Sequence, residues 1–210
     1  MNANYKIAWV GKKSPFCGNV TYSREIVRLL SLKGHEIKFI HFAEEQSDEQ
    51  EITIPYLYKS QIYVIPTLNA SKILFDSLKE WQPDLVHASL PISSLDFTLP
   101  EICQKLRIPL VATFHNAFDR RPNLLNAHRF LFSYQLYAPY LGECNRVVIF
   151  SDLQKQLLER MGVQSQRIEI VPNGIDTVKF SPASSMLKEK YPDKFIITFL
   201  GRIAPEKGLE

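Results

Sequence analysis

Short apolar runs alternate with amphipathic segments along most of the chain. Because apolar runs of this length are typical of buried strands, they predict seven strands, at residues 5–11, 36–42, 84–89, 109–115, 146–150, 167–171 and 195–200. Segments with helical periodicity lie between several of them. The alternation predicts an α/β fold, a Rossmann-like, doubly wound parallel sheet with helices on both faces.

Three of the intervening segments have the features of helices. On one helical face of the first, "VTYSREIVRLLSLKG", lie Tyr22, Ile26, Leu29 and Leu30. Gly34 then stands where glycine commonly ends a helix. The second is "LPEICQKLRI", at residues 99–108. The third follows Ser151, whose spacing to Gln154 is that of a capping box.

Two polar stretches interrupt this pattern. Residues 44–51, "EEQSDEQE", are acidic and polar and predict a solvated loop. Residues 180–194, "FSPASSMLKEKYPDK", are rich in proline, serine and charge, which favours a linker. We therefore expect an N-terminal Rossmann-like domain at 1–180, a linker at 181–194 and the start of a second domain at 195–210.

Composition narrows the class of protein. The 210 residues are 45% hydrophobic, and 25 basic residues against 22 acidic ones leave a net charge of only +3, which argues against a nucleic-acid-binding protein. The cysteines, Cys17, Cys103 and Cys144, have no metal-site spacing and favour a reduced, cytoplasmic protein. The first residues lack the pattern of a signal peptide, and no apolar run approaches the ~20 residues needed to span a bilayer.

Polar residues follow several predicted strands. The loop "KKSPFCGN" follows the first, His115 and Asn116 close another, and "PNGID" follows the strand at 167–171. Ser151 directly follows the strand at 146–150. Because ligands bind beyond the carboxyl ends of parallel strands, we expect a binding site at this edge.

A nicotinamide-dependent enzyme is one alternative for such a sheet. That class has G-x-G-x-x-G after the first strand and an acidic residue after the second. Here Glu44 could serve as the acidic residue, but the first loop holds only Gly11 and Gly18, seven positions apart. The glycine spacing therefore disfavours this class.

Several phrases together resemble one family. The segment from "CNRVVIFSDLQKQ" through "VPNGIDTVKFSP" resembles the end of the N-terminal domain of family 4 retaining glycosyltransferases, which have the GT-B fold. "FLGRIAPEKGLE" resembles the first strand and loop of their C-terminal, nucleotide-sugar-binding domain. "LKGHEIKF", "PDLVHAS" and "IPLVATFHN" match in order and spacing, so the resemblance covers nearly the whole chain.

The resemblance implies roles for individual residues. Arg202 and Lys207 stand where the family binds the donor diphosphate, and His115 stands where it has a histidine close to the donor sugar. Gly18 stands in the glycine-rich first loop, which closes over the donor. The family usually has two glycines there, and Cys17 replaces the first, which removes some backbone freedom.

Those roles define a chemistry. Negative charge develops on the β-phosphate of the leaving group in the transition state. Fixed cations beside that phosphate stabilise this charge. The resemblance implies sugar transfer with retention of anomeric configuration from a UDP- or GDP-sugar to a sugar or lipid acceptor, without a metal or other cofactor. His115 would hydrogen-bond a sugar hydroxyl; the alternative is a purely structural histidine.

Two further segments each allow two interpretations. Asn173, Gly174 and Asp176 form a tight turn by composition, and they could also be a hinge at the mouth of an interdomain cleft. Residues 120–141, "RRPNLLNAHRFLFSYQLYAPYL", combine basic residues with a helix that is apolar on most sides. Such a helix is usually buried, and the alternative is peripheral contact with an anionic membrane or a lipid acceptor.

We expect this chain alone to be inactive, because half of a two-domain cleft does not position a donor. A different class, a non-catalytic sugar- or phosphate-binding module, stays open as the alternative. An apolar strand without a sheet is a template for pairing, so residues 195–200 predict self-association. The expected location is the cytoplasm or its membrane surface.

Overall fold

The fold was analysed in a computed structural model of the 210-residue chain. The structure describes residues 4–14, 17–44, 48–60, 63–90, 93–115 and 124–201, with the backbone alone for 124–131. The chain divides into two compact units, Met1–Pro172 and Asn173–Glu210.

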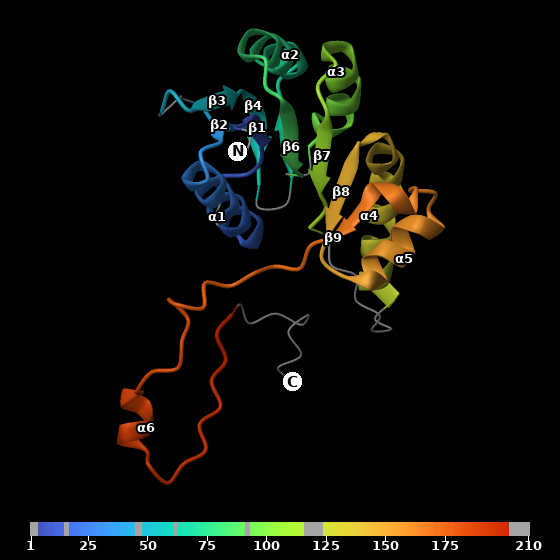
Figure 1. The fold of residues 1–210 in the computed structure, drawn as a ribbon. Helices are drawn as coiled ribbons and strands as arrows, with labels where there is room; N and C mark the ends of the chain where they lie inside the picture. Colours follow the sequence, from blue (N-terminus) through green and yellow to red (C-terminus); the bar gives the residue numbers. More distant parts are fainter. Residues whose placement is uncertain are drawn as a thin grey trace. The chain divides into compact units, whose positions relative to one another are not determined.

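A parallel sheet forms the centre of the first unit (Figure 1). Within the described residues its order is β3-β2-β1-β6-β7-β8-β9, and every pairing is parallel. The strands are β1 (Lys6–Val10), β2 (Glu36–Phe42), β3 (Glu51–Ile54), β6 (Leu85–Ser89), β7 (Leu110–Thr113), β8 (Arg146–Ile149) and β9 (Ile168–Ile170). The strand order reverses between β1 and β6, which is where a ligand crevice is expected in such a sheet.

Helices cover both faces of the sheet, which confirms the predicted fold class. The larger core cluster joins the strands to α2 (Ala70–Trp81), α3 (Leu99–Leu106), α4 (Leu124–Glu143) and α5 (Asp152–Arg160). α1 (Gly18–Leu32) covers the opposite face, apart from α4 and α5 (Figure 1). β1 serves both clusters because alternate residues point to opposite faces: Ala8 and Val10 to the larger, Ile7 and Trp9 to the smaller.

The first predicted helix is present, and most of its predicted apolar face packs against the smaller core cluster. Gly34 has a φ of +91° just beyond the helix end, as a glycine there allows. Leu29, predicted to face the core, is 45% exposed. Tyr22, Ile26 and Leu30 pack against that cluster as predicted, and the fully buried residues of the helix are Val20 and Ser23. The apolar pattern missed the burial of Ser23 because a serine gives no apolar signal.

The region between β2 and β6 contains elements that the apolar pattern does not predict. β3 extends the sheet beside β2, and β4 (Tyr56–Lys59) with β5 (Val64–Pro66) forms an antiparallel hairpin. The prediction of a solvated loop at 44–51 is wrong at Glu51. That residue begins β3, is 7% exposed and pairs with Lys13 and His41. A carboxylate tolerates burial when its charge is paired in this way.

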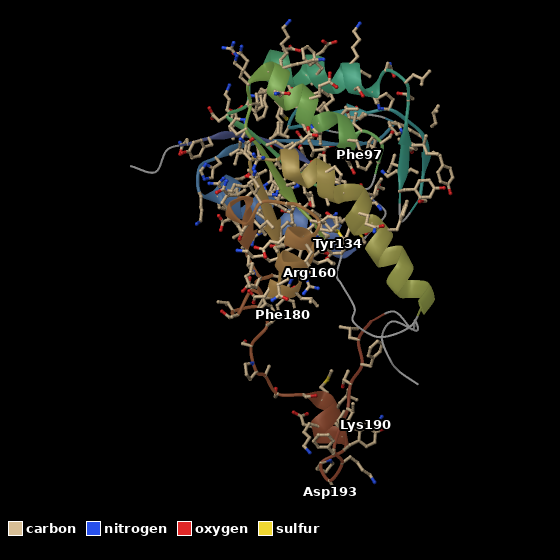
Figure 2. All side chains as sticks on the ribbon, turned by 90° about the vertical axis from the view of Figure 1, so that its right-hand side faces the viewer. Phe97, Tyr134, Arg160, Phe180, Lys190 and Asp193 are labelled. Carbon is tan, nitrogen blue, oxygen red and sulfur yellow. The ribbon has the colours of Figure 1, made fainter. Side chains whose placement is uncertain are left out.

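One face of α4 is buried and another is exposed. Figure 2 labels Tyr134 on this helix and Phe97. Tyr134 and Tyr137 are buried; the ring of Tyr134 lies 4.9 Å from that of Phe114, and the Tyr137 hydroxyl donates to Asp96 at 2.8 Å. Phe132 is 64% exposed. The buried interpretation of residues 120–141 is therefore confirmed for the tyrosine face alone.

The membrane interpretation of the same stretch stays a prediction. Residues 120–123 lie outside the described part of the chain, as do the side chains of 124–131, which include His128 and Arg129. Among the described residues, no helix has both the length and the apolar character that a membrane crossing requires.

Among its described residues, 173–201, the second unit contains one short helix, α6 (Met186–Lys190), within the stretch predicted as a linker. Figure 2 labels Lys190 at the end of this helix. Residues 195–200, predicted as a strand, have no regular secondary structure. A strand requires a hydrogen-bonded neighbour, and none of the described residues pairs with this segment.

Candidate functional site

A group of polar side chains lies at the switch point of the sheet. α1 begins at Gly18, directly after the first loop, and β6 ends at Ser89 on the neighbouring strand. His115 follows β7 by two residues. The fold therefore brings Gly18 and His115, both predicted as site residues, to the same edge of the sheet.

Ser89 connects these elements through hydrogen bonds. Its side chain is fully buried, and its hydroxyl donates to Asn19 Oδ1 at 2.8 Å. The hydroxyl of Ser23, also fully buried, lies 3.1 Å from that of Ser89. The Ser89 oxygen is 2.8 Å from His115 Nε2. The first turn of α1 is thus tied to the ends of β6 and β7.

This network sets the tautomer of His115. A serine hydroxyl has one proton, and that of Ser89 is donated to Asn19. Nε2 of His115 must therefore carry the proton and donate it to the Ser89 oxygen. Nδ1 then presents its lone pair, and no described residue donates a hydrogen bond to it. The lone pair is available to accept a hydrogen bond from a ligand hydroxyl.

Burial keeps His115 neutral. It lowers the pKa of the imidazole from 6.5 to about 4. Aromatic rings supply much of that burial: the ring of Tyr22 meets His115 edge-on at 4.8 Å, and that of Phe150 lies at 5.4 Å. A neutral imidazole suits the positioning of a sugar hydroxyl better than the delivery of a positive charge.

A second histidine, His87, lies one strand away. Its ring stacks on Trp9 at 4.0 Å, and its Nε2 lies 2.8 Å from the Thr113 hydroxyl. Burial, and to a smaller degree the proximity of His115, lowers its pKa to about 3. His87 therefore supports the sheet beside the site as a neutral residue.

The start of α1 leaves space beside the network. A Cβ added to Gly18 would meet no atom within 4 Å, so this glycine is not required by close packing. Cys17 is the residue before the helix, and its side chain makes no capping hydrogen bond. The role of Gly18 in donor binding stays a prediction.

The turn predicted at residues 173–176 belongs to the second unit. Asp176 Oδ1 accepts hydrogen bonds from the backbone N–H groups of Val178 and Lys179, both at 3.0 Å, as a turn-forming aspartate does. Neither Asn173 nor Gly174 has a positive φ. The hinge interpretation of these three residues is untested.

The remaining predicted residues have other positions. Arg202, Lys207 and Asn116 lie outside the described residues. Ser151 caps α5, where its hydroxyl accepts from the Gln154 N–H at 3.4 Å. Among the described residues, no group of three or more His, Cys, Asp or Glu side chains could hold a metal ion.

Sequence reasoning missed Asn19, Ser23 and Ser89. Ser89 was accessible in principle, because it closes a predicted strand at the ligand edge. Asn19 was only the last residue of the polar loop "KKSPFCGN", and Ser23 carried no local signal. They look like ordinary polar residues of a surface helix until that helix is packed against β6.

A curated protein is similar in sequence to most of this chain. The chain is 28% identical over 168 residues to the UDP-Gal:alpha-D-GlcNAc-diphosphoundecaprenol alpha-1,3-galactosyltransferase of Escherichia coli. The match covers 74% of this chain and 41% of that protein. The chain therefore spans about two fifths of the length of this relative.

Solved structures show the same fold. Anabaena Alr3699/HepE in complex with UDP-glucose superposes with a TM-score of 0.70 at 14% identity, over 98% of this chain and 55% of that one. A glycosyltransferase from Rickettsia africae ESF-5 superposes with a TM-score of 0.58 at 21% identity, over 92% and 51%. At these identities the likeness shows the fold alone, the N-terminal half of a GT-B architecture.

A family model confirms the resemblance seen in the sequence. The model described as Glycosyltransferase Family 4 matches residues 17–179, which is more than half of the 210-residue chain. These residues include the whole network around Ser89 and His115. The chain belongs to Glycosyltransferase Family 4.

Proposed function

We propose that the chain is the acceptor-side domain of a glycosyltransferase that moves a sugar from a nucleotide-diphosphate-sugar donor to an acceptor, with retention of anomeric configuration. The observation that supports this most is the neutral, oriented His115, which lies at the switch point of a Family 4 domain. The Ser89 hydroxyl holds its Nε2, which leaves Nδ1 for a sugar hydroxyl.

In this proposal the cations that stabilise the leaving group are Arg202 and Lys207. As the bond between sugar and nucleotide breaks, negative charge grows on the β-phosphate, and an arginine fork with a lysine point charge opposes it. This stabilisation invokes no metal ion. Among the described residues, His115 contacts Ser89, Tyr22 and Phe150, none of which is a carboxylate nucleophile. Attack by the acceptor on the face that the nucleotide leaves would account for retention.

The substrates named for similar proteins support a more specific proposal for the donor and the acceptor. The E. coli relative is named for UDP-galactose and a diphosphoundecaprenol-linked acceptor, and the Anabaena structure contains UDP-glucose. We therefore propose a UDP-hexose as donor, with a GDP-sugar as the alternative, and a sugar attached to a lipid diphosphate as acceptor. The reaction would take place at the cytoplasmic membrane surface.

The test uses the intact protein that contains this chain. Transfer from radiolabelled UDP-galactose and UDP-glucose to a GlcNAc-diphospholipid is measured, and NMR of the product gives its anomeric configuration. We expect an α-linked product from the α-linked donor. His115→Ala should lower kcat by at least ten-fold, and Lys207→Ala by roughly a hundred-fold, the usual loss when a charge-stabilising group is removed.

A matched histidine provides the control. His35 lies before β2, at the amino edge of the same sheet, and His35→Ala should keep the wild-type kcat. If His115→Ala also turns over at the wild-type rate with saturating donor, His115 is structural and its proposed role is wrong. A β-linked product would contradict retention.

A further inference from the structure

The antiparallel hairpin of β4 and β5 has one buried face and one exposed face. Val64 on β5 is 3% exposed and belongs to the larger core cluster. On the opposite face lie Tyr58 and Ile65, which are cross-strand partners, and Tyr63, whose ring is 5.7 Å from that of Tyr58. Because alternate residues of a strand point to opposite faces, the burial of Val64 directs its two neighbours outward.

The exposed face is apolar and aromatic. Tyr58 is 51% exposed, and Tyr63 and Ile65 are each 45% exposed. Leu57, at the register shift of β4, is 70% exposed, and Leu68, two residues after β5, is fully exposed. These five residues are called the hairpin patch below. Exposed apolar side chains that gather in one place usually mark an interaction surface, and tyrosines beside aliphatic residues are typical of a lipid interface.

The segment that carries the hairpin patch has positive charge and no negative charge of its own. Between Glu51 and Asp76 the sequence contains two lysines, Lys59 and Lys72, and no acidic residue. Within the described part of the chain neither lysine forms a salt bridge. An anionic surface would therefore meet the hairpin patch without repulsion from any carboxylate of this segment.

The same charges argue against a second copy of the chain as the partner. A twofold contact through the hairpin patch would bring the lysines of both copies to one interface, where no carboxylate of the segment could balance them. A bilayer that contains anionic lipid offers the opposite charge, and its interface accepts tyrosine and leucine side chains. Charge and composition therefore both favour a bilayer over a second copy.

The hairpin is joined to the candidate site through the segment that follows β6. Val64 forms an isolated β-bridge with Ser93. The backbone N–H and the hydroxyl of Ser93 donate to the buried carboxylate of Asp96 at 2.9 and 3.1 Å. At the start of the same segment, the carbonyl oxygen of Leu90 accepts from Asn19 Nδ2 at 3.2 Å, and Asn19 belongs to the hydrogen-bond network of the site. These contacts join the hairpin and the site within one compact unit.

We propose that the hairpin patch docks this domain on an anionic bilayer. Its tyrosine and aliphatic side chains enter the interface, and the lysines of the segment add electrostatic attraction to the lipid headgroups. The inference rests on the proposed function, because an acceptor attached to a lipid has to be reached at a membrane. It differs from the membrane prediction for residues 120–141, since it assigns the contact to another element of the fold.

Sedimentation with vesicles tests the docking without any sugar substrate. The 210-residue chain is mixed with vesicles of phosphatidylcholine, or of phosphatidylcholine and phosphatidylglycerol in equal parts, and we expect tighter binding to the mixed vesicles. The double variant Leu57→Ser, Ile65→Ser should bind them about ten-fold or more weakly, because two apolar side chains no longer enter the interface. The matched control is Leu32→Ser, Leu29→Ser on α1. Its two leucines are 72% and 45% exposed, against 70% and 45% for the hairpin pair, and it should bind as wild type.

A tryptophan reporter locates the contact on the molecule. Leu68→Trp places an indole in the hairpin patch, and Leu32→Trp places one at the exposed control position on α1. Vesicles with brominated acyl chains quench a tryptophan that enters the interface. We expect such vesicles to quench the added fluorescence of Leu68→Trp and to leave that of Leu32→Trp unchanged.

The docking is wrong if the chain does not bind the mixed vesicles, if the hairpin double variant binds them as wild type, or if Leu68→Trp is not quenched. A dimer in light scattering that the hairpin double variant separates would assign the patch to a second copy instead. Circular dichroism establishes that each variant is folded, and Leu68→Ser replaces the double variant if the latter is not. If vesicle binding fails while the intact protein transfers sugar, the proposed function stands and the docking is wrong. If binding holds while transfer fails, the reverse applies.

Discussion

At the scale of single residues, burial decides the protonation of His115 and His87. Their pKa values are lowered from 6.5 to about 4 and about 3. Between pH 6.5 and those values the unfolded chain binds more protons than the folded one, so stability falls as the pH is lowered. The contribution of these histidines is complete above pH 6.5 and is lost progressively as the pH falls toward 4.

The resulting prediction concerns the slope of stability with pH. Urea unfolding of the chain at pH 7.0, 6.0 and 5.0 should show a decreasing free energy of unfolding. His115→Asn, which does not titrate in this range, should give a visibly smaller decrease. If both proteins lose stability equally between pH 7.0 and 5.0, His115 is not held neutral by burial.

At the same scale, the candidate site depends on residues that pattern reading could only partly find. His115 was predicted because a histidine at the end of a strand is conspicuous in the sequence and matches the family. Ser89 closes a predicted strand, yet nothing local shows that its hydroxyl orients the imidazole. That role appears only when β6, β7 and α1 are brought together.

At the scale of elements, the start of α5 connects helix capping to the site. Ser151 caps the helix as the spacing predicted. The buried side chain of Gln154 accepts from the Phe150 N–H at 2.9 Å. Phe150 in turn packs beside His115. The cap thus holds one wall of the site.

Removal of the cap should therefore reduce stability measurably. Ser151→Ala leaves an N–H group of the first turn without its acceptor and should lower the free energy of unfolding by about 1 kcal/mol. Urea denaturation gives the value. Ser165→Ala, at an exposed serine before β9, is the control and should change it little. An equal loss in the two variants would mean that the cap contributes nothing specific.

Strands could be predicted where their own residues form a continuous apolar run. The strands β1, β2, β6, β7, β8 and β9 are apolar runs in a buried sheet, and all were predicted. β3 was missed because it begins at Glu51, an acidic residue that only its pairing with Lys13 and His41 makes compatible with burial. The hairpin of β4 and β5 was missed because its strands are only four and three residues long and are apolar without a regular alternation of apolar and polar residues.

At the scale of the whole molecule, the second unit exposes large apolar side chains. Phe195 is 92% exposed, Ile197 86% and Leu200 98%. Contiguous exposed apolar residues without a partner favour association with another copy of the chain.

Light scattering should show this association as a concentration-dependent mass. The comparison is a version that ends at Pro182, which keeps the complete core of the first unit. We expect the shorter version to stay monomeric while the 210-residue chain forms larger species. Monomers of both at the same concentrations, with amide exchange slow at residues 195–200, would show that this segment is protected within a single chain.

The alternation of apolar runs and helical segments by itself determined the parallel α/β sheet. Each apolar run is short enough for a strand, and a crossover segment joins it to the next run. Motifs such as "VPNGID" determined the family, because they occur in order along the chain. Only the tertiary structure decided which polar residues act together. Asn19 and Ser89 are 70 positions apart, and the sheet order places them in hydrogen-bond contact. Lys59 reaches Ser14 in the same way across 45 positions, because hydrogen bonds between distant residues depend on packing rather than on local sequence.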